Sequence, residues 1–101
     1  MRLSDEDLQG RTIIAADGQI IGKINALFMD SDAWRVESLQ VTLRKKIADD
    51  LGAHRTLFHA GTLEIPTRMV QSVGTTVVLS VPVDGLRAVL PSEGERVPAH
   101  H

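Results

Sequence analysis

The sequence predicts a mostly β protein, folded as a small closed or nearly closed antiparallel β-barrel with one short inserted helix. Five or six short segments carry apolar residues at the spacing of β-strands, and turn residues separate them. Only one longer segment has helical spacing. The 101 residues include one tryptophan, two phenylalanines and no tyrosine, so the core must be built mainly from aliphatic side chains. These features together favour a single domain with a small barrel core.

The first predicted elements are a helical turn and a hairpin. Ser4 is suited to cap a helix and acidic residues follow it, but Gly10 limits that helix to about one turn. The isoleucine-rich segment 11–15 then meets Asp17-Gly18, a strong hairpin signal. We therefore expect the first two strands to pair.

The second strand is predicted to be long, from Ile20 to Asp30. Strict alternation along it places one set of residues in the core: Gly22, Ile24, Ala26 and Phe28. Leu27 and Met29 then face outward, where a further surface is needed to cover them.

The third strand is predicted over residues 34–44, after an acidic turn. Leu39 and Leu43 share one parity, whereas Trp34 has the other. We expect either a bulge near Glu37-Ser38 or a start that packs outward.

The remaining segments complete the predicted barrel. Lys45 to Gly52 has helical spacing and a glycine stop, and Pro66 ends a fourth strand region. The further expected segments are strand residues Leu57-Phe58, Leu63 and Ile65, a turn over 67–70, a fifth strand over 75–81 and a brief helix over 84–90. The folded domain is thus expected to span 1–90, with a flexible C-terminal tail over 91–101.

The segments Ile47-Ala48-Asp49-Asp50-Leu51-Gly52 and Thr67-Arg68-Met69-Val70 resemble the stand-alone form of the PRC-barrel domain, found mainly in archaea and some bacteria. Several further short motifs resemble the same domain. They lie in the family's order between Ser4 and Val81: Leu8-x-Gly10, Asp17-Gly18, Ile21-Gly22-Lys23-Ile24, the turn at Asp30, Glu64-Ile65-Pro66, Val73-Gly74 and Val77-Val78-Leu79. The resemblance implies a six-stranded barrel that docks on other macromolecules and has no general catalytic residue set. Some archaeal relatives are associated with cell division as adaptors. The specific functions of the photosynthetic H subunit and of the ribosome maturation factor are not carried over, because the chain lacks their additional segments.

Composition narrows the function classes. Without cysteine the chain has no disulfide framework and no thiolate metal site. A net charge of −2 and a pI near 6.0 argue against a dedicated nucleic-acid binder. The sequence shows no signal peptide and no apolar run of membrane-spanning length, so we expect a cytoplasmic protein.

Histidine positions indicate no metal site. His54 and His59 are not spaced to share one face, and a site would need further ligands. His100 and His101 close the chain and do not define a site.

Catalytic and calcium motifs are not recognised either. Asp30-x-Asp32 lacks the glycine and glutamate of a calcium loop, with Arg35 and Val41 in their places. The sequence also lacks a nucleophile-elbow motif and a phosphate loop. We therefore predict no enzyme activity, no cofactor and no metal.

The leading functional hypothesis is a non-enzymatic adaptor that homodimerises and presents its barrel surface to a protein partner. Its predicted contact residues are Leu27, Met29 and Trp34. The alternative is an RNA-associated or ribosome-associated accessory domain. Its contacts would be Arg44, Lys45 and Lys46. A small-ligand or metal-binding barrel is less favoured, because no convergent polar cluster is visible.

Overall fold

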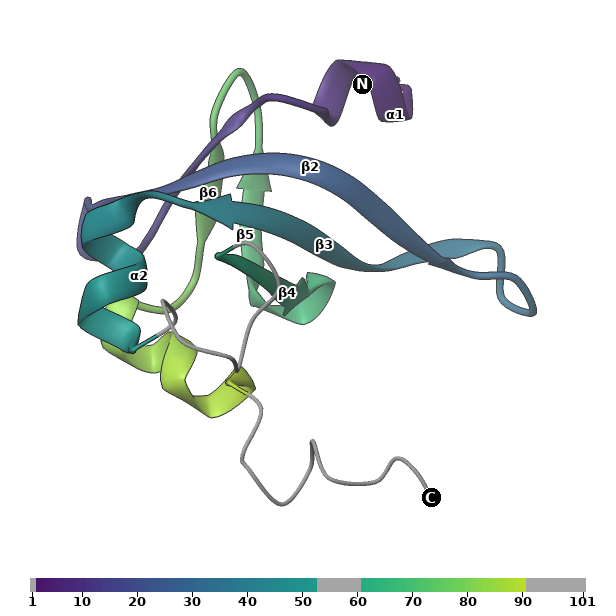
Figure 1. Ribbon diagram of the computed structural model, residues 1–101. Coiled ribbons are helices and arrows are strands. Elements are labelled where there is room, and N and C mark those ends of the chain that lie inside the picture. Colours follow the sequence, from purple (N-terminus) through teal and green to yellow (C-terminus); the bar gives the residue numbers. More distant parts are fainter. Residues whose placement is uncertain (1, 53–60, 91–101) are drawn as a thin grey trace, which may run out of the picture.

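The computed structural model describes residues 2–52 and 61–90, and Figure 1 traces their path. Within these residues, six strands form one sheet in the order β4-β3-β2-β1-β6-β5. The strands are β1 (Thr12–Ile14), β2 (Ile20–Asp30), β3 (Arg35–Leu43), β4 (Thr62–Pro66), β5 (Val70–Val73) and β6 (Val77–Leu79). The helices are α1 (Asp5–Leu8), α2 (Lys45–Leu51) and the 3-10 segments η1 (Thr67–Met69) and η2 (Val83–Val89).

The first helix and hairpin match the prediction. Ser4 and Asp7 form a capping box around the single turn of α1. The pKa of Asp7 is lowered, mainly by the hydrogen bond from the backbone N–H of Ser4 and to a smaller extent by that of the Ser4 side chain. Gly18 has a φ of 86°, in the left-handed region that glycine enters easily. β1 pairs antiparallel with β2 beyond this turn, as predicted.

The predicted facing of β2 is correct only for its first half. Gly22 and Ile24 are buried, but the pairing with β3 shifts between Ile24 and Ala26, which leaves Asn25 as an extra residue. A bulge of this kind reverses the facing of every residue beyond it. Leu27 therefore packs partly buried against the core, and Phe28 is exposed. The expectation of an inward Phe28 and an outward Leu27 is wrong for this reason.

β3 contains the bulge expected near Glu37-Ser38. Phe28 lies opposite Ser38 and Met29 lies opposite Val36, so Glu37 is the extra residue on β3. The strand begins at Arg35, one residue later than predicted.

The later elements are confirmed in part. α2 ends at Gly52, whose φ of 75° is the expected left-handed stop. The turn expected over 67–70 is wrong at its end, because β5 begins at Val70 and pairs antiparallel with β6. The predicted strand residues Leu57-Phe58 and the predicted tail over 91–101 lie outside the described residues.

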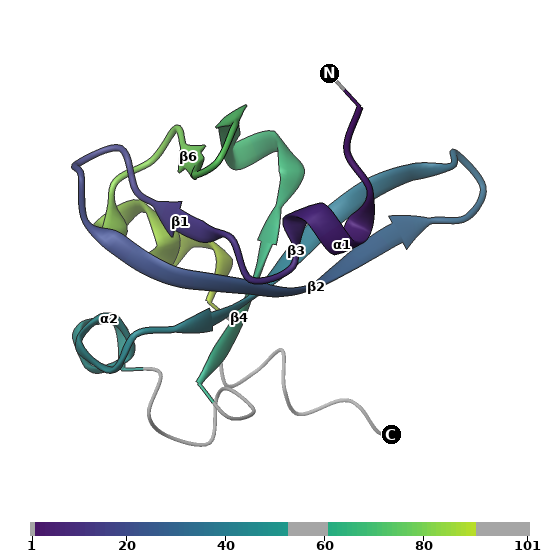
Figure 2. The ribbon, with the colours of Figure 1, turned by 90° about the horizontal axis from the view of Figure 1, so that it is seen from above.

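The sheet differs from the expected antiparallel barrel in two ways. β1 and β6 run parallel, with Ile13 opposite Val77, so the sheet is mixed. The strand order also does not close on itself, and in the described part of the chain β4 and β5 are its two edges. Figure 2 shows how strongly the sheet curls despite this opening.

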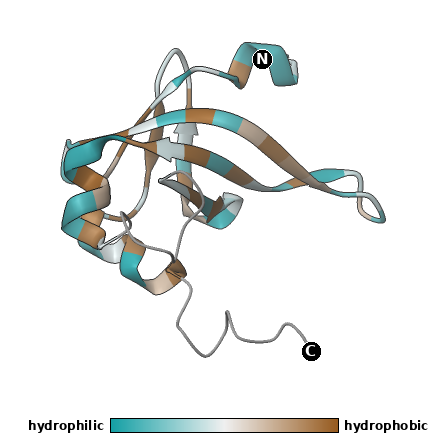
Figure 3. Cartoon of the chain, viewed as in Figure 1, coloured by the Kyte–Doolittle hydropathy of each residue, from teal (hydrophilic) through white to brown (hydrophobic). Residues whose placement is uncertain are grey.

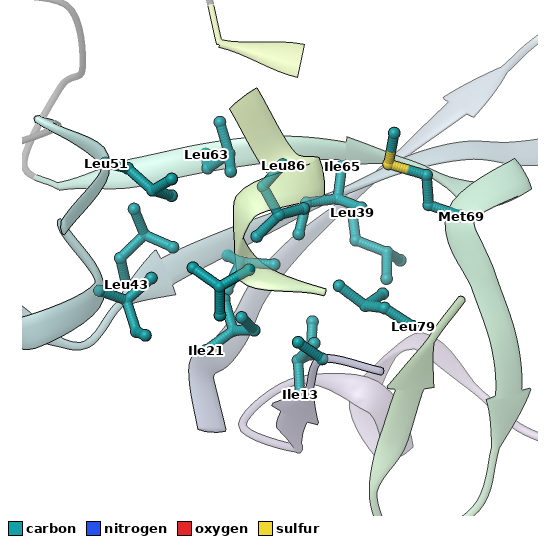
Figure 4. Close-up of a cluster of buried hydrophobic side chains, with 14 of the residues drawn as sticks. Ile13, Ile21, Leu39, Leu43, Leu51, Leu63, Ile65, Met69, Leu79 and Leu86 are labelled. Atoms are coloured by element: carbon teal, nitrogen blue, oxygen red, sulfur yellow. The ribbon is translucent and has the colours of Figure 1, made fainter. Parts of the chain in front are cut away.

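A single aliphatic core lies inside the curled sheet. Figure 4 shows side chains from the sheet, α2 and η2 converging on one cluster, with Leu86 of η2 among them. Ile13, Ile21, Ile65, Leu79 and Leu86 are essentially inaccessible to solvent. Among the described residues the predicted reliance on aliphatic side chains is confirmed, because neither Phe28 nor Trp34 belongs to this cluster. Phe58 lies outside the described residues.

Candidate interaction surface

The distal parts of β2 and β3 form a hairpin arm that extends beyond the body of the protein. We use "the arm" for residues 27–38, and Figures 1 and 2 both show it projecting to the right. Figure 3 shows apolar residues along both of its strands. Phe28, Met29 and Trp34 are 38%, 53% and 79% exposed. Three large apolar side chains on a projecting element are typical of an interaction surface.

The turn at the end of the arm is held by Asp30. Its carboxylate accepts hydrogen bonds from the backbone N–H groups of Asp32 and Ala33, at 2.9 and 3.3 Å. The N–H of Trp34 donates to the backbone oxygen of Asp30 at 2.8 Å. Asp30 thus serves the turn, in the manner of other aspartates that begin turns.

Trp34 has an unusual backbone conformation within this turn. Its φ of 55° makes it the only non-glycine residue with positive φ in the described residues. The left-handed conformation costs an L residue about 1 to 2 kcal/mol. The turn therefore displays an exposed indole in a position that glycine or asparagine would occupy more easily.

The structure brings two of the three predicted contact residues together. Met29 and Trp34 lie on the arm and are exposed, whereas Leu27 packs against the core. Phe28 was missed because strict alternation assigned it to the core. Only the bulge at Asn25 exposes it, and no local sequence signal marks that bulge.

A polar cavity of about 770 Å³ lies beside the arm. We call it the polar cavity and define it by six of its lining residues: Arg35, Glu37, Ser38, Glu64, Thr67 and Arg68. The hydroxyl of the buried Ser38 donates to the Glu64 carboxylate at 2.5 Å. The hydroxyl of Thr67 lies 3.2 Å from the backbone oxygens of both Val36 and Glu37. These bonds join β3, β4 and η1 beneath the cavity, which carries side chains of both charges.

A second, apolar groove of about 380 Å³ lies between β5 and the β2–β3 sheet. We call it the apolar groove and define it by Leu8, Ile24, Val36, Leu39, Val70 and Val73. All four residues of the edge strand β5 belong to its lining. The groove thus joins apolar side chains to an edge of the sheet, where extended segments can pair.

The predicted basic contact residues are all accessible. Arg44, Lys45 and Lys46 are exposed at the start of α2, and an Arg44 guanidinium nitrogen lies 3.5 Å from the Ile20 backbone oxygen. Asp49 and Asp50 are exposed later in the same short helix. The helix surface therefore carries both charges.

Metal ligands do not cluster in the part of the chain that the structure describes. Across residues 2–52 and 61–90, no three histidine or carboxylate side chains gather in a way that could hold an ion. His54 and His59 lie outside the described residues, as do His100 and His101. Among the described helices, none has the length and apolar character needed to cross a membrane.

The chain matches the model of a known protein family. The family model for the PRC-barrel domain matches residues 2–86. This range includes every described strand and most of η2. No curated protein matches the sequence.

Proposed function

Because the chain belongs to the PRC-barrel domain family, a general protein-interaction family, we propose that it is a non-enzymatic adaptor that homodimerises and docks on a protein partner. The observation that carries this proposal is the arm with its exposed Phe28, Met29 and Trp34. The cytoplasmic location expected from the sequence stays a prediction.

The arm supports homodimerisation on energetic grounds. Covering a large apolar side chain contributes about 1.5 to 3 kcal/mol, against which the cost of association must be set. Phe28 and Met29 are consecutive residues of β2, so they lie on opposite faces of the arm. A two-fold interface requires that one of these faces be a self-complementary patch.

Sedimentation equilibrium of the wild type and of Met29→Glu tests the dimer. Met29 is 53% exposed, so the substitution places a charge on the patch without burying it in the core. We expect a wild-type dimer at high micromolar concentration and a folded, monomeric Met29→Glu variant. Ile20→Glu is the matched control, because Ile20 is 41% exposed but lies at the other end of β2. A monomeric wild type would contradict the proposal.

RNA or ribosome association remains the alternative, supported by the exposure of Arg44, Lys45 and Lys46. Phosphate contacts make affinity fall steeply with salt. A titration of RNA binding at rising salt tests this alternative, with Lys45→Glu and Lys46→Glu combined as the variant. Binding that is absent, or that is insensitive to both salt and the variant, would remove it.

A further inference from the structure

The groove and the arm are complementary features of the same chain. The apolar groove is a hollow of about 380 Å³ lined by aliphatic side chains of α1, β2, β3, β5 and β6. The arm carries Trp34, the most exposed of the large apolar side chains in the described residues. Tryptophan is one of the residues enriched at interface hot spots, which lie in well-packed pockets.

The backbone conformation of the turn holds the Trp34 side chain out in solvent, where it can insert into another molecule, and keeps it from packing onto its own arm. Trp34 stays 79% exposed while its backbone holds a left-handed conformation, with the turn fixed by the hydrogen bonds of Asp30. Backbone strain kept at an exposed aromatic residue points to a functional role for that residue. If only the stability of the fold mattered, glycine would suit this position better than an L-amino acid.

The placement of the groove specifies how two copies would meet. Ile24 and Leu39 place one end of the groove at the base of the arm, and Val36 extends its lining along the arm toward Trp34 at the tip. Two arms packed antiparallel about a two-fold axis bring each tip to the base of the other arm. Each Trp34 then reaches the partner's groove, and both contacts form together.

We infer that the apolar groove receives Trp34 from a second copy of this chain, in a reciprocal dimer of antiparallel arms. The inference rests on the proposed homodimer and adds its contact surfaces. In this arrangement the groove of each copy is filled only when the indole of Trp34 from the other copy enters it. The edge strand β5 then lies against the partner's turn instead of being open to other strands.

The single tryptophan provides a direct readout of this contact. As the wild type is concentrated into the dimer range, Trp34 emission should shift to shorter wavelength, because the indole leaves water. Val73→Glu puts a charge on the groove rim at a residue that is 39% exposed. It should raise the dimer Kd at least tenfold, since anchors in pockets dominate binding energy, and abolish the emission shift. Ile20→Glu lies at a similarly exposed residue that does not line the groove. It should change the dimer Kd by less than about twofold and leave the emission shift in place.

Cross-linking identifies the contact even if Val73→Glu folds poorly. The chain has no cysteine, so Ala33→Cys marks the tip and Ser72→Cys marks the groove rim without side reactions. Both positions are exposed. A mixture of the two variants should yield a disulfide-linked heterodimer, and Ala33→Cys alone should yield little linked product.

The outcomes separate the inference from the proposed function. A monomeric wild type overturns both. A wild-type dimer that is weakened by Met29→Glu but not by Val73→Glu keeps the homodimer and overturns the groove contact. Efficient linking of Ala33→Cys to itself, with no gain on adding Ser72→Cys, also overturns it, because the two tips would then lie together.

Discussion

Replacing Gly22 by alanine tests how closely β2 and β3 approach each other. Gly22 is buried and lies opposite Leu43. A Cβ atom at this position would lie 2.9 Å from the carbonyl carbon of Thr42 and 3.1 Å from Leu43 Cα, and closer still to the Thr42 oxygen. These are backbone atoms, so no side-chain rotation relieves the contact.

The cost of this substitution follows from the position of β3 within the sheet. β3 cannot retreat freely, because Thr42 also lies opposite Thr62 of β4. Overpacking costs about 1 to 3 kcal/mol, and each weakened ladder hydrogen bond costs about 1 kcal/mol. We expect Gly22→Ala to lower the free energy of unfolding by about 3 kcal/mol, which lowers Tm by roughly 12 to 24 °C in a domain of this size.

Urea and thermal unfolding followed by far-UV circular dichroism measure the loss. Tryptophan emission is a poor probe here, because Trp34 is already exposed in the folded state. Gly74→Ala is the matched control, since its Cβ would lie 3.8 Å from the nearest atom, the backbone oxygen of Thr76. The control should stay within about 0.5 kcal/mol of wild type. Equal stability of the two variants would refute the close approach.

Four other substitutions offer further tests. Trp34→Gly removes a left-handed strain of about 1 to 2 kcal/mol, partly offset by about 0.5 to 1 kcal/mol of glycine chain entropy, so Tm should rise while sedimentation shows a weaker dimer. Leu27→Glu should lower the unfolding free energy by more than about 2 kcal/mol in urea, because its carboxylate faces the core. Phe28→Glu should cost less than about 1 kcal/mol, and equal losses would argue against the bulge. The lowered pKa of Asp7 means that its contribution to α1 is present above the ordinary carboxyl pKa and is lost as pH falls through the lowered value. Ser4→Ala should raise that pKa only in part in an NMR titration, because the backbone N–H of residue 4 still donates to the carboxylate. An unchanged pKa would contradict the contribution of the Ser4 side chain.

Local signals explain the parts of the fold that the sequence predicts well. The hairpin at Asp17-Gly18, the single turn after Ser4 and the stop of α2 at Gly52 each depend on residues within a few positions. Their turn and cap chemistry is decided by backbone conformation, which neighbouring residues control.

Long-range contacts explain what the sequence did not reveal. The bulge at Asn25 reverses the facing of Leu27 and Phe28. Both residues are apolar, so the sequence pattern alone does not say which of them faces the core. The parallel pairing of β1 with β6 depends on how the whole sheet curls.

The candidate surface was predictable only at the arm. The exposure of Trp34 follows from its polar turn. Met29 is exposed although the bulge turns it to the same side as Leu27, because the arm extends beyond the core at this point. The apolar groove draws its lining from six separate elements, and no spacing in the sequence brings these together.

The parallel pair of β1 and β6 also has a consequence for the order of folding. The β2–β3 hairpin joins residues that are close in the chain, whereas Ile13 and Val77 come together only when most of the chain is in place. The Arg11 guanidinium donates to the backbone oxygen of Gly74, so a second long-range bond forms in the same step. Closing long loops before their contacts form slows folding. We therefore expect the arm to form early and the joining of the two chain halves to limit the refolding rate. In stopped-flow measurements, substitutions in the β2–β3 hairpin would then alter refolding more than substitutions at Val77.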